Sequence, residues 1–297
     1  MRILVNGACG QLGYEVVREA LDRGYAVIAS GLRNADFGAF SAMDITDEAN
    51  VRDVIYSFGA EAVIHCAAWT AVDDAEDPEL RDKVYAVNYM GTVNVAKACR
   101  EISAKLIYIS TDYVFGGSGS QPHRADDMDF APINEYGRSK LAGERAVREM
   151  LDRYFIVRTS WLFGRGRNFV TTMINAGQKY ESVRVVSDQI GTSTYAADLA
   201  KLLVDMVETE KYGCYNGVNS GGYISWYDFC REIYHRAGMT TKVIPVTTAE
   251  YGACRARRPL NSRLDTGKLE ASGFRPLPDW KDALERYLRS MDALWDM

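Results

Sequence analysis

The chain has 297 residues, of which 47% are hydrophobic and 25% are charged, and its formal net charge is −5. This length suits about two domains or one large α/β unit, with a core that needs no disulfide or metal to fold. The acidic balance gives no electrostatic basis for binding nucleic acid, and no stretch approaches the ~20 apolar residues of a membrane span. The apolar run before Gly7 is too short for a signal peptide, so we expect a cytoplasmic globular protein.

Cysteine and histidine usage argues against a metal centre. The six cysteines include no Cys-x-x-Cys pair, and the chain has only three histidines, so no zinc-ligand spacing can be assembled. We expect reduced thiols and no bound metal ion.

The first 160 residues alternate β-rich runs with helical stretches, the pattern of a parallel sheet covered by helices on both faces. Asp77 and Pro78 supply an N-cap and a first helical residue, so we expect a long helix to open there. Its apolar stripe extends to Ala98. The other expected elements of this half are strands at 2–6, 25–29, 62–66, 105–109 and 155–157, and helices at 11–23, 47–58 and 134–151.

The later half of the sequence is less regular. We expect it to form a smaller, discontinuous lobe that lies against the first sheet, with some segments returning to that sheet. The expected elements are helices at 168–177, 197–207, 226–237 and 280–294, and a strand at 183–186.

A glycine-rich turn joins the first strand to the first helix, with Gly7, Gly10 and Gly13 spaced Gly-x-x-Gly-x-x-Gly. Glycines permit a tight turn and let backbone amides and a helix N-terminus approach a pyrophosphate. Such glycines can also be purely structural, but their place at the start of a βα pattern favours a dinucleotide site. We predict a Rossmann-like doubly wound parallel sheet, with 1–160 binding the dinucleotide and 161–297 mainly binding substrate.

Three further residues suggest ketone reduction. Tyr136 and Lys140 lie four residues apart, on one face of an expected helix. A nearby lysine cation lowers a tyrosine pKa toward the range of a general acid, although such pairs also decorate helix surfaces. Thr111 ends an expected strand at the sheet edge where α/β proteins bind ligands, and its hydroxyl can donate to a carbonyl oxygen. The alternative for Thr111 is an ordinary turn residue.

These residues resemble the extended short-chain dehydrogenase/reductase family, and the resemblance covers essentially the whole chain. The matching segments include two strings that are quite specific, Ser110–Phe115 and Arg158–Trp161. The others are Gly7–Gly13 with Glu15, Ala67–Asp73 with Glu76, Val87–Asn88 with Gly91–Thr92, Tyr136–Glu144, Asp188–Gly191, and Arg258–Pro259 with Asn261–Leu264.

The resemblance implies an oxidoreductase that transfers hydride from a reduced nicotinamide to C4 of a dTDP-4-keto-6-deoxy-L-hexose, in nucleotide-sugar and polysaccharide synthesis. It makes Tyr136 the proton donor, Lys140 the residue that lowers its pKa and holds the nicotinamide ribose, and Thr111 the group that polarises the ketone. Substrate contacts would include Thr111, Asp112, Trp161 and Arg258. Cofactor contacts would include Gly7, Gly10, Gln11, Leu12, Gly13, Asp44, Ile45, Ala67, Ala68, Trp69, Tyr136 and Lys140, and the residues after the second strand add Arg33 as a further candidate.

The end of the second strand bears on the choice of cofactor. Proteins that prefer NAD usually carry an acidic residue there, whereas this chain has Ser30-Gly31-Leu32-Arg33. An arginine can pair with a 2′-phosphate, so we predict NADPH, with NADH as the alternative. Arg33 pointing into solvent is the competing interpretation.

Other functions fit the same framework. Another nucleotide-sugar 4-ketoreductase or epimerase is one alternative, and a non-catalytic regulatory subunit similar to the methionine adenosyltransferase β subunit is another. The intact trio Thr111, Tyr136 and Lys140 favours an enzyme. Some family members hold Mg²⁺ between subunits through a glutamate such as Glu15, but the chemistry does not need it. A second copy of the chain is a further candidate partner.

Overall fold

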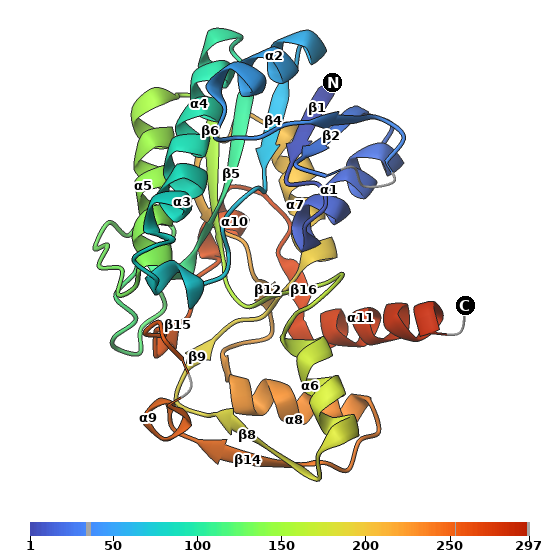
Figure 1. Ribbon diagram of the computed structural model, residues 1–297. Coiled ribbons are helices and arrows are strands. Elements are labelled where there is room, and N and C mark those ends of the chain that lie inside the picture. The colour runs from blue at the N-terminus through green and yellow to red at the C-terminus, as the bar shows by residue number, and fades with distance from the viewer. Residues whose placement is uncertain (34–36, 253, 296–297) are drawn as a thin grey trace.

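A seven-stranded parallel sheet forms the centre of the computed structural model, which describes residues 1–33, 37–252 and 254–295 (Figure 1). Its strand order is β11-β6-β5-β4-β1-β2-β3, and every pairing is parallel. Because β1 lies between β2 and β4, the order reverses there, which is where doubly wound sheets bind ligands. The strands are β1 (Arg2–Asn6), β2 (Ala26–Gly31), β3 (Phe40–Ala42), β4 (Ala62–His65), β5 (Lys105–Thr111), β6 (Tyr154–Thr159) and β11 (Gly213–Asn216).

Helices cover both faces of the sheet, as the predicted fold class requires (Figure 1). Alternate strand residues face opposite sides. In β1, Ile3 and Val5 pack with α1 (Gln11–Asp22) and α7 (Ala196–Val207), whereas Leu4 contributes to the core on the other face. That second core is closed by α2 (Glu48–Phe58), α4 (Gly91–Glu101) and α5 (Glu135–Met150).

The predicted elements of the first half are confirmed to within a few residues, except for the helix expected at Asp77. The helix expected at Asp77 begins instead with α3 (Arg81–Tyr85), because the Asp77 carboxylate accepts the Glu79 amide in a turn. A π-helical turn, η2 (Ala86–Met90), then joins α3 to α4. The short strands β3 and β11 were not predicted.

The later residues form a lobe with its own aromatic-rich core below the sheet (Figure 1). Some of them return to the sheet, since β11 is its edge strand and α7 packs on α1. The division near residue 160 stays a prediction. The remaining elements are β7 (Leu162–Phe163), α6 (Phe169–Lys179), β8 (Ser182–Val186), β9 (Ile190–Gly191), β10 (Thr194–Tyr195), β12 (Asn219–Ser220), β13 (Ile224–Ser225), α8 (Trp226–Arg236), β14 (Lys242–Val246), α9 (Thr248–Tyr251), β15 (Asn261–Ser262), α10 (Gly267–Ala271), β16 (Leu277–Asp279) and α11 (Trp280–Trp295), besides the 3-10 turns η1 (Asp74–Glu76) and η3 (Asp112–Val114).

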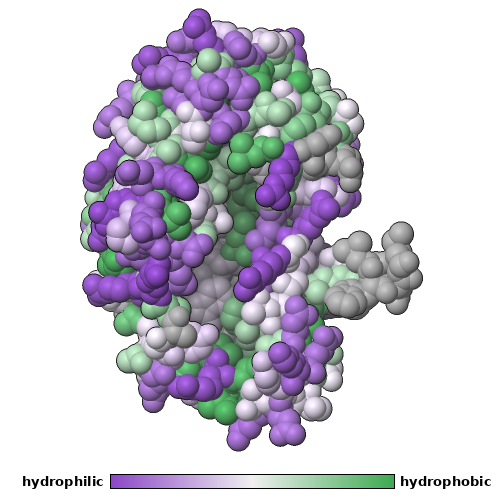
Figure 2. Space-filling model, viewed as in Figure 1, coloured by the Kyte–Doolittle hydropathy of each residue, from purple (hydrophilic) through white to green (hydrophobic). Residues whose placement is uncertain are grey.

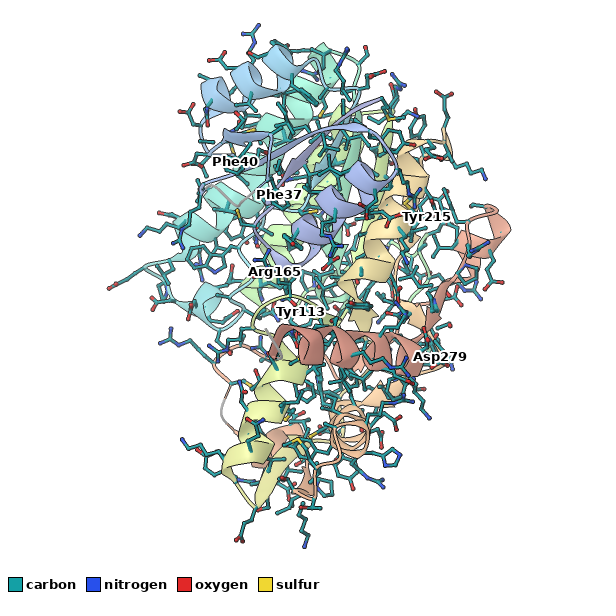
Figure 3. The ribbon with its side chains drawn as sticks, turned by 90° about the vertical axis from the view of Figure 1, so that its right-hand side faces the viewer. Phe37, Phe40, Tyr113, Arg165, Tyr215 and Asp279 are labelled. Carbon is teal, nitrogen blue, oxygen red and sulfur yellow. The ribbon has the colours of Figure 1, made fainter. Side chains whose placement is uncertain are left out.

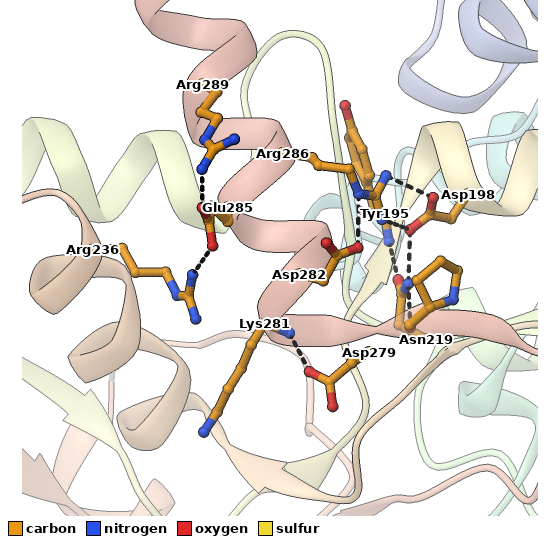
Figure 4. Close-up of polar contacts among 11 residues, drawn as sticks. Tyr195, Asp198, Asn219, Arg236, Asp279, Lys281, Asp282, Glu285, Arg286 and Arg289 are labelled. Atoms are coloured by element: carbon orange, nitrogen blue, oxygen red, sulfur yellow. Dashed lines mark hydrogen bonds and ion pairs between the residues drawn. The ribbon is translucent and has the colours of Figure 1, made fainter.

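Ion pairs tie α11 to the rest of the fold (Figure 4). The Arg286 guanidinium donates to both oxygens of the buried Asp198 carboxylate of α7, at 2.8 and 2.7 Å. Asn219 donates to the same carboxylate at 2.9 Å, and Arg236 of α8 pairs with Glu285 at 2.6 Å. The later lobe is thereby attached to the helix layer of the sheet. Within the described ranges, no helix is both long and apolar enough to cross a membrane.

Candidate active site

A cavity of about 880 Å³ lies at the carboxyl ends of the sheet strands, between the sheet and the later lobe. Figure 2 shows it as a hollow in the middle of the molecule, and Figure 3 places Tyr113, one of its lining residues, at the level where the two parts meet. The predicted site residues that line it are Gly7, Gly10, Gln11, Leu12, Gly13, Arg33, Asp44, Ile45, Ala67, Ala68, Trp69, Thr111, Asp112, Tyr136, Lys140 and Trp161.

The glycine turn after β1 has the shape that a pyrophosphate needs. Gly7 has a φ of 71°, which glycine adopts readily, and a Cβ there would lie 2.5 Å from the Ala67 nitrogen. A Cβ on Gly13 would lie 2.2 Å from the Gly7 carbonyl oxygen. Among the described residues, no side chain caps α1, which begins at Gln11 after Gly10. Its first N–H groups can therefore bind an anion, as the helix dipole also favours.

Thr111 and Tyr136 come together because the start of α5 packs against the turn that follows β5. Thr111 ends β5, and its hydroxyl donates to the Asp112 carboxylate at 3.0 Å. Tyr136 lies in the first turn of α5 beside Gly137, where a Cβ would lie 2.3 Å from the Tyr113 carbonyl oxygen. The rings of Tyr113 and Tyr136 pack edge to face, with centroids 5.6 Å apart. The absence of a side chain at 137 thus permits this approach.

Lys140 follows Tyr136 by one helical turn and is only 3% exposed. Its Nζ lies 4.1 Å from the centroid of the Tyr108 ring, a cation–π contact. Burial lowers the pKa of Lys140 to about 7, and the nearby charge of Glu144 acts in the opposite direction. The Lys140 ammonium therefore titrates near neutral pH.

The surroundings of the Tyr136 phenol favour its protonated form. Burial raises the pKa of Tyr136, the Asp112 carboxylate adds to the rise, and the Thr111 hydroxyl opposes it. Burial outweighs the other effects on this group, and the lowering of its pKa by Lys140 stays a prediction. The raised pKa keeps the phenol protonated through neutral pH, so that it can donate a proton.

Asp112 is a buried carboxylic acid within the same cavity. Burial raises the pKa of Asp112 to about 7, while hydrogen bonds with the hydroxyl groups of Ser262 and Thr111 act against this rise. One of its oxygens, Oδ2, is buried without a hydrogen-bond partner among the described residues. A substrate hydroxyl is the kind of group that could satisfy it.

A buried ion pair lies one turn beyond Lys140. Arg158 donates through Nε and Nη2 to the two carboxylate oxygens of Glu144, at 2.9 Å each, and both side chains are fully buried. The guanidinium also lies about 5 Å from the ring centroids of Phe115 and Phe130. The nearby charge of Glu144 raises the pKa of Lys140 and so acts against the effect of burial.

The cavity also includes side chains to which the sequence assigned no role. Trp226 and Arg167 come from the later half, and their local sequence offers no signal. Tyr113, Ser110 and Thr159 adjoin the ends of predicted strands, and this position could have identified them. The other lining residues of this kind are Cys9, Gly31, Leu32, Met43, Cys66, Thr70, Val87, Ile109, Ser160 and Leu162.

The structure does not bring Arg258 into the cavity lining. Its Nη2 donates to the Asp73 carboxylate at 2.7 Å, and its side chain is 17% exposed. Asp73 also accepts the Ala256 amide at 2.9 Å. Arg258 therefore holds the segment before β15 against the residues that follow β4, and its contact with substrate stays a prediction.

Comparison with known proteins identifies the family. Residues 1–293 match the family model described as the RmlD substrate binding domain. The chain belongs to the RmlD family. One RmlD relative, a dTDP-4-dehydrorhamnose reductase of Streptomyces griseus, is 41% identical over 95% of this chain and 91% of its own. A dTDP-4-keto-6-deoxy-D-glucose reductase of Streptomyces niveus is 36% identical over 98% of each.

A solved structure shares the fold closely. The dTDP-4-dehydrorhamnose reductase of Bacillus anthracis, crystallised in complex with NADP, superimposes with a TM-score of 0.89 at 40% identity, covering 97% of this chain and 99% of that one. The predicted Rossmann-like fold class is thereby confirmed.

Proposed function

We propose that this protein is an NADPH-dependent dTDP-4-dehydrorhamnose reductase, which reduces the C4 ketone of dTDP-4-dehydro-6-deoxy-L-mannose to give dTDP-L-rhamnose. The observation that carries the proposal is that Thr111, Tyr136 and Lys140 line the same cavity as the glycine turn of residues 7–13. The named activity of the RmlD relatives supports the sugar and the position of reduction.

The residues divide the chemistry as follows. The Thr111 hydroxyl donates a hydrogen bond to the C4 carbonyl oxygen and polarises it. Tyr136 Oη transfers its proton to that oxygen as the ketone becomes an alcohol, leaving a phenolate. The Lys140 ammonium stabilises this phenolate until solvent returns the proton. Bound dihydronicotinamide would supply the hydride to C4.

The glycine turn and Arg33 are the residues that would hold the cofactor. Arg33 lines the cavity just after β2, and no carboxylate occupies positions 30–32. A guanidinium there favours the 2′-phosphate of NADPH. We expect Arg33→Ala to lower kcat/KM about tenfold with NADPH and little with NADH. An equal loss with both cofactors would contradict this role.

The direct test is turnover with a panel of dTDP-4-keto-6-deoxy sugars. We expect NADPH oxidation to be fastest with dTDP-4-dehydro-6-deoxy-L-mannose, and NMR of the product to show the C4 configuration of L-rhamnose. No oxidation with any member of the panel, by protein shown to bind NADPH, would overturn the proposal and favour a non-catalytic subunit.

A second candidate is reduction of the D-configured 4-keto sugar. The Streptomyces niveus relative favours it, because a protein 36% identical to this chain is named for dTDP-4-keto-6-deoxy-D-glucose. The same panel separates the two activities. A kcat/KM higher for dTDP-4-keto-6-deoxy-D-glucose than for the L-sugar would replace the first assignment with the second.

A further inference from the structure

Trp161 has an unusual backbone that its surroundings hold in place. Its φ is 47°, in the left-handed region that residues other than glycine seldom adopt. The Ser160 hydroxyl donates to the Thr192 carbonyl at 2.6 Å, and the Thr194 hydroxyl donates to the Ser160 carbonyl at 2.7 Å. The Thr194 amide donates to the Trp161 carbonyl at 3.2 Å. Such conformations persist only where several contacts fix them, and they gather at functional sites.

The Trp161 indole is confined by two later segments of the chain. A Cβ on Gly191 would lie 2.9 Å from Trp161 Cε2, so this glycine lets the ring approach the β9 backbone. The Trp226 ring stacks on Trp161 with centroids 3.8 Å apart and an angle of 16° between the planes. Each ring therefore covers one face of the other, and both side chains line the cavity that includes Thr111.

Trp226 is itself fixed at the start of α8. The preceding residue, Ser225, caps the helix by accepting the Asp228 amide at 3.0 Å, and the Asp228 carboxylate accepts the Ser225 amide in return. The ring of Phe169 on α6 packs against the Trp226 ring, with 4.4 Å between the two ring centroids. A capped helix end and a neighbouring helix thus set the position of the Trp226 ring.

We propose that Trp226 is a positioning residue that holds Trp161 as the apolar wall of the sugar subsite. The part of the Trp161 indole that Trp226 leaves uncovered can contact the C–H groups and methyl of a 6-deoxyhexose, and a wall that shifts would misplace C4 relative to Tyr136. Trp226 acts through Trp161 on the sugar and leaves the dinucleotide turn untouched. This inference rests on the proposed function, since it assumes that a 6-deoxy sugar occupies the cavity.

Kinetics of three variants test the role. We expect Trp226→Ala to lower kcat/KM for the keto sugar about tenfold or more, with the Kd for NADPH changed by less than about twofold. Trp226→Phe, which restores an aromatic face, should recover most of that loss. The matched control is Trp280→Phe, because Trp280 packs on Phe229 in the same lobe but does not line the cavity. The control should keep the wild-type kcat/KM.

A spectroscopic arm separates this inference from the proposed function. Stacked indoles give an exciton couplet in circular dichroism, which Trp161→Phe and Trp226→Phe should each abolish and Trp280→Phe should retain. If the couplet is absent from the wild type, or if Trp226→Ala keeps the wild-type kcat/KM, the positioning role is wrong. If the wild type reduces no sugar, the proposed function fails, while the couplet still decides whether Trp226 holds Trp161.

Discussion

The two sides of the cavity are built in different ways. On the side formed by the sheet, each functional residue lies at the end of a strand or the start of a helix. The glycine turn leads into α1, Thr111 ends β5, and Tyr136 lies in the first turn of α5, so the element that contains or follows each residue sets its position. The side formed by the later lobe uses large side chains, Trp161 and Trp226, which are distant in sequence and fixed by contacts with one another.

This difference suggests that the two sides of the cavity have different roles. The sheet side contains the groups to which we assign the steps common to nicotinamide-dependent ketone reductions, namely binding of the pyrophosphate and donation of a proton. The later side presents a surface whose shape depends on tertiary packing, which is where sugar selectivity can change without loss of chemistry. Variants on the sheet side should therefore affect catalysis or cofactor binding, and variants on the later side should affect sugar use or stability.

Tyr136→Phe should have the largest effect. Removing the phenolic hydroxyl removes the proton donor, and we expect kcat to fall about 10²- to 10⁴-fold while the Kd for NADPH changes by less than about twofold. Single-turnover kinetics and a cofactor titration measure the two quantities. Tyr215→Phe is the control, because it deletes a hydroxyl that donates to the Lys211 carbonyl away from the cavity. A Tyr136→Phe enzyme with wild-type kcat would refute the proton-donor role.

Gly13→Ala should damage the cofactor site. Alanine favours helices, but here its Cβ would meet the Gly7 carbonyl oxygen at 2.2 Å, and backbone must shift to relieve the clash. We expect the Kd for NADPH to rise about tenfold or more, because the displaced turn no longer approaches the pyrophosphate. Gly38→Ala is the matched control, since a Cβ there meets nothing within 4 Å. Unchanged NADPH affinity in Gly13→Ala would show that the turn is merely structural.

The pH dependence should report Lys140. The pKa of Lys140 is about 7 in the fold against an ordinary value of 10.5, so its ammonium is lost as pH rises through 7. We expect kcat/KM to fall across that pH range and the fall to move to higher pH in Lys140→Arg. A fall at the same pH in both proteins would assign it to another group.

The lowered pKa of Lys140 also predicts how the stability of the fold depends on pH. Between pH 7 and 10.5 the unfolded chain binds the Lys140 proton and the native fold does not, so the free energy of unfolding should rise with pH over this interval. Lys140→Met should remove this contribution, which urea unfolding at several pH values would measure. An unchanged pH slope in Lys140→Met would contradict the lowered pKa.

The elements that the sequence predicts correctly are those set by local sequence patterns, and the elements it misses depend on tertiary contacts. β1, the glycine turn and α1 were predicted nearly to the residue, because strand periodicity, glycine spacing and a helical stripe all act locally. β3 and β11 were missed because strands of three or four residues depend on their neighbours in the sheet. The helix start at Asp77 was wrong because an aspartate followed by proline also favours a turn.

The candidate site also divides into residues that local patterns predict and residues that only the tertiary fold brings together. Thr111, Tyr136 and Lys140 could be found because each lies at a fixed place on a predictable element. Trp226 could not, since only the tertiary fold brings it to Trp161. The resemblance to the family implied a substrate contact for Arg258, but the pairing of Arg258 with Asp73 could not be predicted, because Asp73 lies in a distant segment that no spacing rule identifies.

The smallest effects should come from the two ion pairs of Arg286 on α11, one with Asp198 of α7 and one with Asp282 of α11 itself. Asp198 and Asp282 both bind Arg286, but the Asp198 side chain is 1% exposed and that of Asp282 is 58% exposed. We expect Asp198→Asn to lower the free energy of unfolding by about 1–3 kcal/mol. The loss should lie toward the lower end of this range, because Arg286 is 35% exposed and solvent weakens its ion pair. Asp282→Asn should cost less than about 0.5 kcal/mol. Both variants should keep the wild-type Kd for NADPH, because neither carboxylate lines the cavity. Equal destabilisation by the two variants would mean that burial does not decide how much an ion pair of Arg286 stabilises the fold.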